Sequence, residues 1–215
     1  CRKWLLKRTF FSVLILAAGA NLASLCYRAI NASASACSGI GEAVSWALNE
    51  CRNTKPVAAG IDTLLHWSTD NGGMRDADRW LRDTYPKARL SVMCPNSLYG
   101  AMAIGGMGLA LELRRHLPNI RLNETHPKVL FYAITGKRYR PADLASAVEW
   151  FASYSSLTII GDISNDDQFD ALLSAWATRE GYADGWQDLV SPDVNDQIFP
   201  VGEVNYLWPR TRSTA

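Results

Sequence analysis

Acidic residues gather at three places in the sequence where a strand or a helix is expected to begin or end. Asp62 interrupts the apolar run VAAGIDTLLHW, Glu124 follows the run IRLN, and Asp166, Asp167 and Asp170 open the stretch DDQFDALLSAWATRE. A carboxylate inside an apolar segment is costly unless it is paired, hydrogen-bonded or bound to a metal ion. These five residues are therefore the first candidates for chemistry.

Carboxylates that converge on one pocket repel one another, and a divalent cation removes that repulsion. Oxygen ligands of this type suit Mg²⁺ or Mn²⁺, which keep part of their coordination shell for water and phosphate. Two such ions about 4 Å apart can activate a water and stabilise the leaving oxygen in phosphodiester hydrolysis. The sequence thus favours a site for Mg²⁺ or Mn²⁺, provided that these distant segments meet.

The acidic start of the last stretch also has a structural interpretation. Ser164 or Asn165 can cap a helix, and acidic residues in the first turn complement the positive end of the helix dipole. Capping accounts well for Asp166 and Asp167. It accounts less well for Asp170, which lies one turn further in and shares a helix face with Asp166. Both interpretations stay open at this point.

The elements that would position these residues follow from the apolar pattern. The run TFFSVLIL, residues 57–67 and the run from 120 are typical of strands, and the tail GEVNYLWPR is expected to form an edge segment. Residues 39–56, 97–119, 141–156 and 164–180 are expected to be helical. Strands that alternate with helices predict an α/β fold with a mixed sheet.

Glycines weaken the expected helix at 97–119, where Gly105, Gly106 and Gly108 each reduce helix stability by about 1 kcal/mol relative to alanine. Neither phosphate-loop pattern, GxxxxGK[ST] or GxGxxG after a strand, is present there. We therefore expect this helix to pack closely against a neighbouring element.

Composition bounds the class of protein. The chain has 215 residues, of which 48% are hydrophobic, and this suits a single domain over residues 1–215 with a substantial core. The net charge of +1 gives no global basic field for nucleic acid, and residues 42–215 carry a net charge of −4. Five cysteines without a CxxC pair favour a reducing cytoplasm.

The first 36 residues allow two interpretations. A basic start, an apolar centre and the segment ASASA resemble a signal peptide or membrane anchor, which would make the protein secreted or anchored. The β-branched and aromatic content of TFFSVLIL instead favours a buried strand, and the span is only modestly apolar for a membrane helix. We expect the strand, and no stable membrane association.

Four sequence elements together resemble the family called domain of unknown function 429, a group of predicted RNase H-like nucleases. In order, these are AGIDTLLHW, RDADRWLR, NETHPKVLFYAITGK and DDQFDALLSAWATREG, and the resemblance covers residues 57 to about 210. It implies an RNase H-like mixed sheet flanked by helices. Each element is weakly specific alone, and their order adds to the specificity.

The resemblance also implies roles for individual residues. The metal centre would comprise Asp62, Asp166, Asp167 and Asp170, and the catalytic residues would be Asp62, Glu124, Asp167 and Asp170. The substrate cleft would be lined by Arg75, Asp78, Arg79 and His126. The segment GKRYR, with Lys137 and Tyr139, is either a further patch that contacts substrate phosphate or a solvated turn.

One departure from the family pattern concerns the first strand, where an RNase H-like site relies on an aspartate. No acidic residue precedes Glu42, so the strand has lost its carboxylate or the sequence starts after it. Two functions therefore remain. The first is a metal-dependent nuclease, active or inactive in this form, that acts on phosphodiester bonds of nucleic acid. The alternative, favoured by the missing carboxylate, is a non-catalytic RNase H-like domain that binds nucleotide, nucleic acid or protein.

Overall fold

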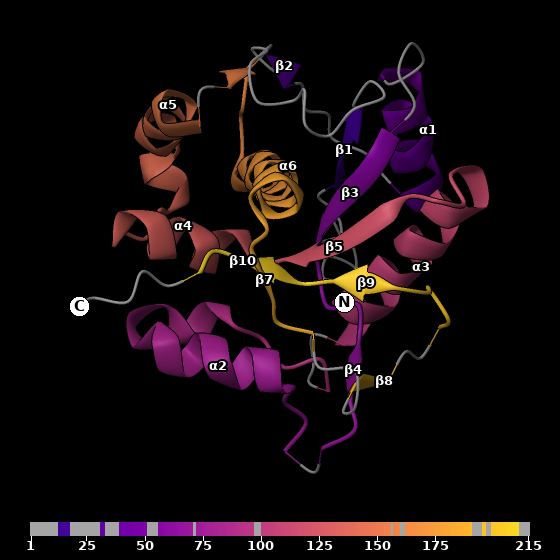
Figure 1. The fold of residues 1–215 in the computed structure, drawn as a ribbon. Helices are drawn as coiled ribbons and strands as arrows, with labels where there is room; N and C mark the ends of the chain where they lie inside the picture. Colours follow the sequence, from indigo (N-terminus) through magenta and orange to yellow (C-terminus); the bar gives the residue numbers. More distant parts are fainter. Residues whose placement is uncertain are drawn as a thin grey trace, which may run out of the picture.

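A four-stranded mixed sheet forms the centre of the protein (Figure 1). The computed structural model describes residues 13–17, 31–32, 39–50, 56–70, 72–96, 100–155, 157–159, 162–190, 195–196 and 199–210. The strands lie in the order β1 (Val13–Ala17), β3 (Pro56–Asp62), β5 (Arg121–Thr125) and β9 (Val204–Asn205). β1 is antiparallel to β3, whereas β3, β5 and β9 are parallel. The predicted α/β fold with a mixed sheet is thus confirmed.

Helices cover both faces of this sheet (Figure 1). α1 (Ile40–Glu50) and α3 (Gly100–His116) lie on one face, and α6 (Asp166–Asp184) lies against β3 and β1 on the other. Around α6 are α2 (Asp76–Thr84), α4 (Pro127–Thr135) and α5 (Leu144–Ser155), with short 3₁₀ helices at Pro86–Ser91 and Pro141–Asp143. In the described part of the chain, no helix has the length and apolar character needed to cross a bilayer.

Short strands form three further pairs. β7 (Gln187–Asp188) pairs with β10 (Leu207–Trp208), β2 (Asn31–Ala32) with β6 (Thr158–Ile159), and β4 (Trp67–Ser68) with β8 (Asn195–Asp196). β1 overlaps the second half of the expected strand TFFSVLIL, and the rest of the first 36 residues lies outside the described residues except for β2. A strand is thus present at residues 13–17, and the choice between a buried strand and a signal segment for the first 36 residues stays a prediction.

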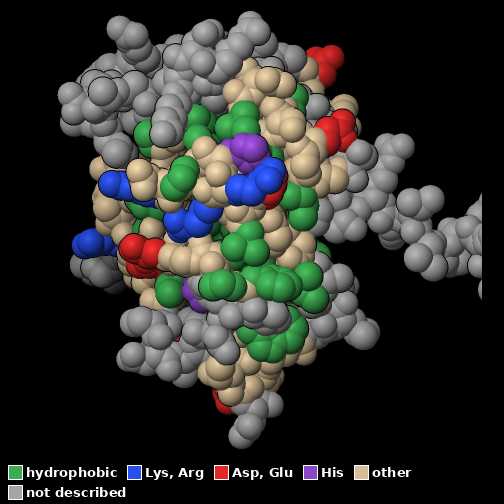
Figure 2. All heavy atoms as spheres, turned by 90° about the vertical axis from the view of Figure 1, so that its right-hand side faces the viewer, with side chains coloured by type: hydrophobic (Ala, Val, Ile, Leu, Met, Phe, Trp, Pro, Cys, Tyr) green, Lys and Arg blue, Asp and Glu red, His purple; other side chains and the backbone are tan. Residues whose placement is uncertain are grey.

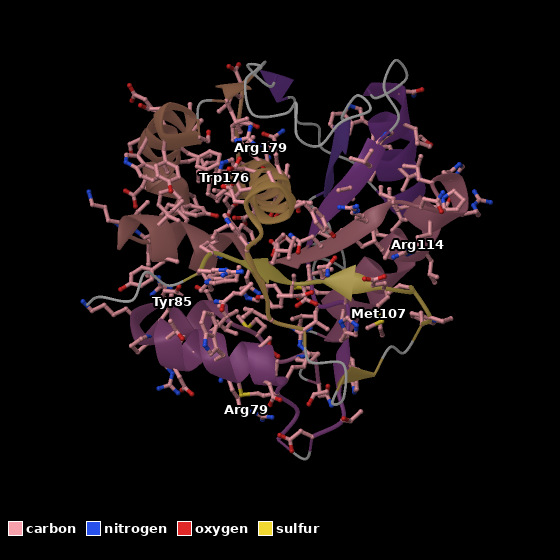
Figure 3. The ribbon with its side chains drawn as sticks, in the orientation of Figure 1. Arg79, Tyr85, Met107, Arg114, Trp176 and Arg179 are labelled. Carbon is pink, nitrogen blue, oxygen red and sulfur yellow. The ribbon has the colours of Figure 1, made fainter. Side chains whose placement is uncertain are left out.

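Two buried clusters divide the core. Aliphatic residues of α1, α3 and β3, such as Ile61 and Leu113, form one cluster. Aromatic side chains dominate the other, between α6 and helices α4 and α5. There Trp176 of α6 lies edge-on to Phe151 of α5, with ring centroids 5.4 Å apart (Figure 3 labels Trp176). β3 contributes Ala59 and Ile61 to the aliphatic cluster.

Close packing explains two glycines. An added Cβ at Gly60 of β3 would lie 2.3 Å from the carbonyl oxygen of Ser174 in α6. An added Cβ at Gly106 of α3 would lie 2.2 Å from the side chain of Thr63. The expectation that the glycines of 97–119 serve close helix packing is therefore confirmed at Gly106.

The strand expected at 57–67 is shorter than predicted. β3 ends at Asp62, and the chain then turns, with the Thr63 N–H donating to the carbonyl of Ile61 over 2.9 Å. Beyond the turn, the Leu65 N–H donates to a carboxylate oxygen of Glu124 over 2.8 Å. Asp62 consequently lies at the carboxyl end of its strand and not in the middle of an apolar one.

Candidate functional site

Asp62 and Asp170 meet where the end of β3 faces α6. Gly60 and Asp62 point to the same side of the sheet, because side chains alternate along a strand, and Gly60 touches α6 at Ser174. Asp170 precedes Ser174 by one helical turn, and the Ser174 hydroxyl donates to the Asp170 carbonyl over 2.7 Å. Asp170 is also the strongest electrostatic neighbour of Asp62. The geometry thus brings together two predicted site residues that are far apart in the sequence.

The start of α6 answers the question of capping. Asn165 is the N-cap residue, and its side chain accepts from the Gln168 N–H over 2.9 Å. Asp166 and Asp167 occupy the first turn, where their charges complement the helix dipole. Asp170 is buried instead, with 2% of its surface exposed. Capping therefore explains two of the three aspartates, and Asp170 needs a different explanation.

Lys128 supplies the positive charge in this region. Its ammonium group lies 3.1 Å from Oδ2 of Asp170 and 3.2 Å from Oδ2 of Asp166. The second carboxylate oxygen of Asp170 accepts a hydrogen bond from the Tyr139 hydroxyl. Burial alone would lower the pKa of Lys128, but Asp170 and Asp166 together raise it above its ordinary value. We refer to Asp62, Lys128, Tyr139, Asp166 and Asp170 as the carboxylate–lysine centre.

Burial dominates the protonation of this centre. It raises the pKa of the Asp62 carboxyl well above its ordinary value, and the adjacent Asp170 raises it further, while Lys128 opposes both. Burial also raises the pKa of Asp170 to about 6, again against the effect of Lys128. Two neighbouring carboxyl groups with raised pKa values retain protons closer to neutral pH than exposed aspartates do.

A pocket of about 270 Å³ opens beside Asp62. Its wall is formed by Asp62, Thr63, Leu64, Leu90, Ser91, Met93, Met102, His126, Pro127 and Lys128. His126 lies at the pocket, as predicted for a cleft residue, and its Nε2 lies 2.9 Å from the carbonyl oxygen of Ser91. Burial lowers the pKa of His126, so the imidazole is neutral at physiological pH.

Glu124 and Arg75 form a separate buried network. Arg75 donates to both carboxylate oxygens of Glu124, over 2.5 and 2.8 Å, and to both oxygens of Asp78, over 2.8 and 3.0 Å. None of the three residues is more than 3% exposed. Their charges are paired with one another and covered by the fold. The roles of Arg75 and Asp78 in a substrate cleft and of Glu124 in catalysis stay predictions. No local pattern in the sequence identifies Arg75 and Glu124 as partners, because they are 49 positions apart.

The remaining predicted substrate contacts lie elsewhere. Arg79 is paired with Asp70 over 2.6 Å and with Asp76 over 3.0 Å, at the lower edge of the molecule, away from α6 (Figure 3). In the structure its charge is paired with two carboxylates, and its role in a substrate cleft stays a prediction. Lys137 is exposed in the loop after α4, two positions before Tyr139. The side chain of Lys137 is therefore accessible to a ligand.

Basic side chains also gather at the end of α3, on the face shown in Figure 2. Arg115 lies 2.7 Å and His116 3.2 Å from the same oxygen of Glu112, and Arg114 donates to the Glu203 carbonyl over 2.5 Å. Acidic and apolar side chains lie close to the basic ones on this face (Figure 2). Glu112 therefore offsets part of the positive charge of this cluster.

The carboxylates of Asp166 and Asp170 in the centre are already engaged by other protein groups. Both carboxylate oxygens of Asp170 are engaged by Lys128 and Tyr139, and Lys128 also contacts Asp166. Within the ranges that the structure describes, no group of three or more His, Cys, Asp or Glu side chains could hold a metal ion. The lysine already supplies the compensating charge that Mg²⁺ or Mn²⁺ would bring, so a cation would have to displace its ammonium group.

Comparison with family models, with curated proteins and with solved structures found no match. The resemblance to the RNase H-like group consequently rests on the four sequence elements. Any function assigned to the protein rests on the site itself.

Proposed function

We propose that the protein is a non-catalytic RNase H-like domain that binds nucleic acid and whose carboxylate centre is neutralised by its own lysine. The observation that carries the proposal is the position of Lys128, within 3.2 Å of Asp166 and 3.1 Å of Asp170. An ammonium group held in this way compensates the buried carboxylate without a metal ion. Carboxylate oxygens that would bind a catalytic cation are therefore already engaged by protein groups.

Nucleic acid is the preferred ligand because exposed cations lie next to this centre. Lys137, Arg138 and Arg140 are exposed in the loop that also carries Tyr139, whose hydroxyl donates to Asp170. Exposed lysine and arginine side chains supply most of the affinity of proteins for phosphate backbones. Since the net charge of the chain is only +1, such binding must be local.

Fluorescence anisotropy with labelled single-stranded DNA, single-stranded RNA and duplex DNA tests the proposal. We expect binding of at least one probe at 50 mM salt, equal with EDTA or with Mn²⁺, and no cleavage in Mn²⁺. Absence of binding to all three probes would refute a nucleic-acid-binding role. Cleavage in Mn²⁺ that is lost in Asp62→Asn would refute the non-catalytic part.

A metal-dependent nuclease is the second candidate, and one observation favours it. Asp62 and Asp170 meet at the carboxyl end of β3, and Asp62 faces a pocket of about 270 Å³. Lys128 would have to withdraw before a cation could bind there. Calorimetric titration of Lys128→Met with Mn²⁺, beside the double variant Lys128→Met/Asp170→Asn, tests this possibility. The nuclease interpretation requires Mn²⁺ binding in the first variant and its loss in the second.

A further inference from the structure

A second hollow lies among residues of α4, α5 and the segment that joins them, and Tyr139, which donates to Asp170, is part of its lining. Its volume is about 470 Å³, within the range of about 300–1,000 Å³ typical of small-molecule sites. It is lined by Phe131, Ile134, Thr135, Lys137, Arg138, Tyr139, Asp143, Ser146, Ala147 and Trp150. We refer to these residues as the α4–α5 hollow.

The hollow presents positive charge. α4 ends at Gly136, which has a left-handed backbone (φ 69°), and the chain turns so that Lys137 and Arg138 are both exposed at the rim. Within the described ranges, neither side chain makes an ion pair. The carboxylate that lines the hollow, Asp143, is paired with Arg140 over 3.1 Å. An anionic group is therefore the complementary ligand for this rim.

An aromatic surface adjoins these cations. Trp150 is 39% exposed and lines the hollow. Tyr154 stacks on its indole ring, with centroids 4.8 Å apart and an interplanar angle of 15°, and Phe131 contacts it edge-on at 5.6 Å. A ring held by two neighbours loses little conformational freedom when a ligand stacks on it. Exposed aromatic rings beside lysine and arginine are the usual surface for stacking unpaired bases.

We infer that the α4–α5 hollow binds a nucleobase against Trp150 and the attached phosphate at Lys137 and Arg138. The inference rests on the proposed function and names its ligand as single-stranded nucleic acid. In a duplex, each base is already stacked and paired, so its face is not available to a protein ring without unstacking. A free nucleotide has the same chemistry, and the experiment must distinguish it from a strand.

Binding of labelled oligothymidine, of a duplex of the same length and of a labelled mononucleotide is measured by anisotropy. We expect Trp150→Ala to weaken oligothymidine binding about 10-fold and Trp150→Phe to retain most of the affinity. Lys137→Gln/Arg138→Gln should weaken it to a similar extent. Arg115→Gln, which removes one positive charge on α3, is the matched control and should bind like the unmodified protein. Thermal unfolding confirms that each variant is folded.

The outcomes separate the inference from the proposed function. If the unmodified protein binds no nucleic acid, the proposed function fails. If it binds oligothymidine and Trp150→Ala binds equally well, only the hollow is refuted. Tight binding of the mononucleotide that Trp150→Ala abolishes would support the hollow and make a free nucleotide its ligand. Duplex binding stronger than strand binding would overturn the inference.

Discussion

Two groups of buried charges at the heart of the molecule are compensated by different means. Arg75 is enclosed by the carboxylates of Glu124 and Asp78, and all three are at most 3% exposed. Lys128, by contrast, is 44% exposed at its side chain and reaches inward to Asp170, which is 4% exposed. A fully buried pair tolerates no loss of either partner, whereas a half-exposed lysine can exchange its partner for solvent.

Arg75→Met should therefore destabilise the protein strongly, because it leaves Glu124 buried without a counter-charge. We expect a loss of about 3–5 kcal/mol in the free energy of unfolding. Urea denaturation measures the free energy of unfolding of Arg75→Met and of the control variant Arg79→Met. Arg79 is a partly exposed arginine paired with two carboxylates, and its loss should change stability much less than the loss of Arg75. Equal effects of the two substitutions would contradict the buried network.

The pKa of Asp170, raised by burial to about 6, predicts a dependence of stability on pH. A carboxyl group whose pKa is higher in the folded state than in the unfolded state contributes stability at low pH and loses it as the pH rises through the folded pKa. For Asp170 this window runs from pH about 4 to about 6, with a loss on the order of 2 kcal/mol.

Asp170→Asn should flatten this part of the pH profile. Chemical denaturation at several pH values between 4 and 7 measures the difference between the variant and the unmodified protein. Asp83→Asn, which alters an exposed carboxylate of α2, serves as the control and should leave that window unchanged. The raised pKa would be contradicted if the stability of the unmodified protein rose between pH 4 and 6 and that of Asp170→Asn changed in parallel.

At the scale of elements, the contact of β3 with α6 builds the centre. Gly60 allows the strand to approach the carbonyl of Ser174, and the approach places Asp62 near Asp170. Since this carbonyl belongs to the backbone of a long helix, it cannot yield as a flexible side chain could. The whole site therefore depends on a residue that carries no functional group.

Gly60→Ala should accordingly be strongly destabilising, by about 2 kcal/mol or more, because its Cβ would lie 2.3 Å from a backbone oxygen. Gly41→Ala in α1 is the matched control, since no atom lies within 4 Å of the added Cβ there. That substitution should stabilise the protein by up to about 1 kcal/mol. Thermal or urea unfolding compares the two, and a neutral Gly60→Ala would contradict the close approach of α6.

Elements with local signals were predictable from the sequence. The cap at Asn165, the acidic first turn of α6 and the proline at the start of α4 all lie within a few residues of the helix ends that they specify. The end of β3 at Asp62 was not predictable, because the following turn is held by Glu124, 59 positions after Leu65. The same holds for the pairing of Lys128 with Asp170, which depends on how α4 packs on α6.

At the scale of the whole molecule, Lys137 and Arg138 at the α4–α5 hollow are two of several exposed cations, which also include Lys87 and Arg89. The net charge of +1 supplies no long-range attraction, and the basic end of α3 is paired with Glu112. Any binding of a polyanion should then depend on a few local cations. The slope of log K against log salt should report how many cations contact phosphate.

The dependence of affinity on salt is therefore expected to be shallow. For a single strand held by two phosphate contacts, the slope of log K against log salt is about −1.4. Lys137→Gln/Arg138→Gln should bring this slope close to zero, whereas Trp150→Ala should lower affinity and leave the slope unchanged. Anisotropy titrations between 50 and 200 mM salt measure both quantities. A steep slope that survives the double substitution would place the phosphates on another surface.

Tyr139 has one further consequence, because its ring lines the α4–α5 hollow while its hydroxyl donates to Asp170. A ligand that contacts this ring changes the surroundings of the Asp170 carboxyl group, whose pKa is about 6. By reciprocity, the occupancy of the hollow and the number of protons held by the protein influence each other. Binding heats near pH 6, compared in buffers of unlike ionisation enthalpy, would reveal that exchange as a fraction of a proton taken up or released.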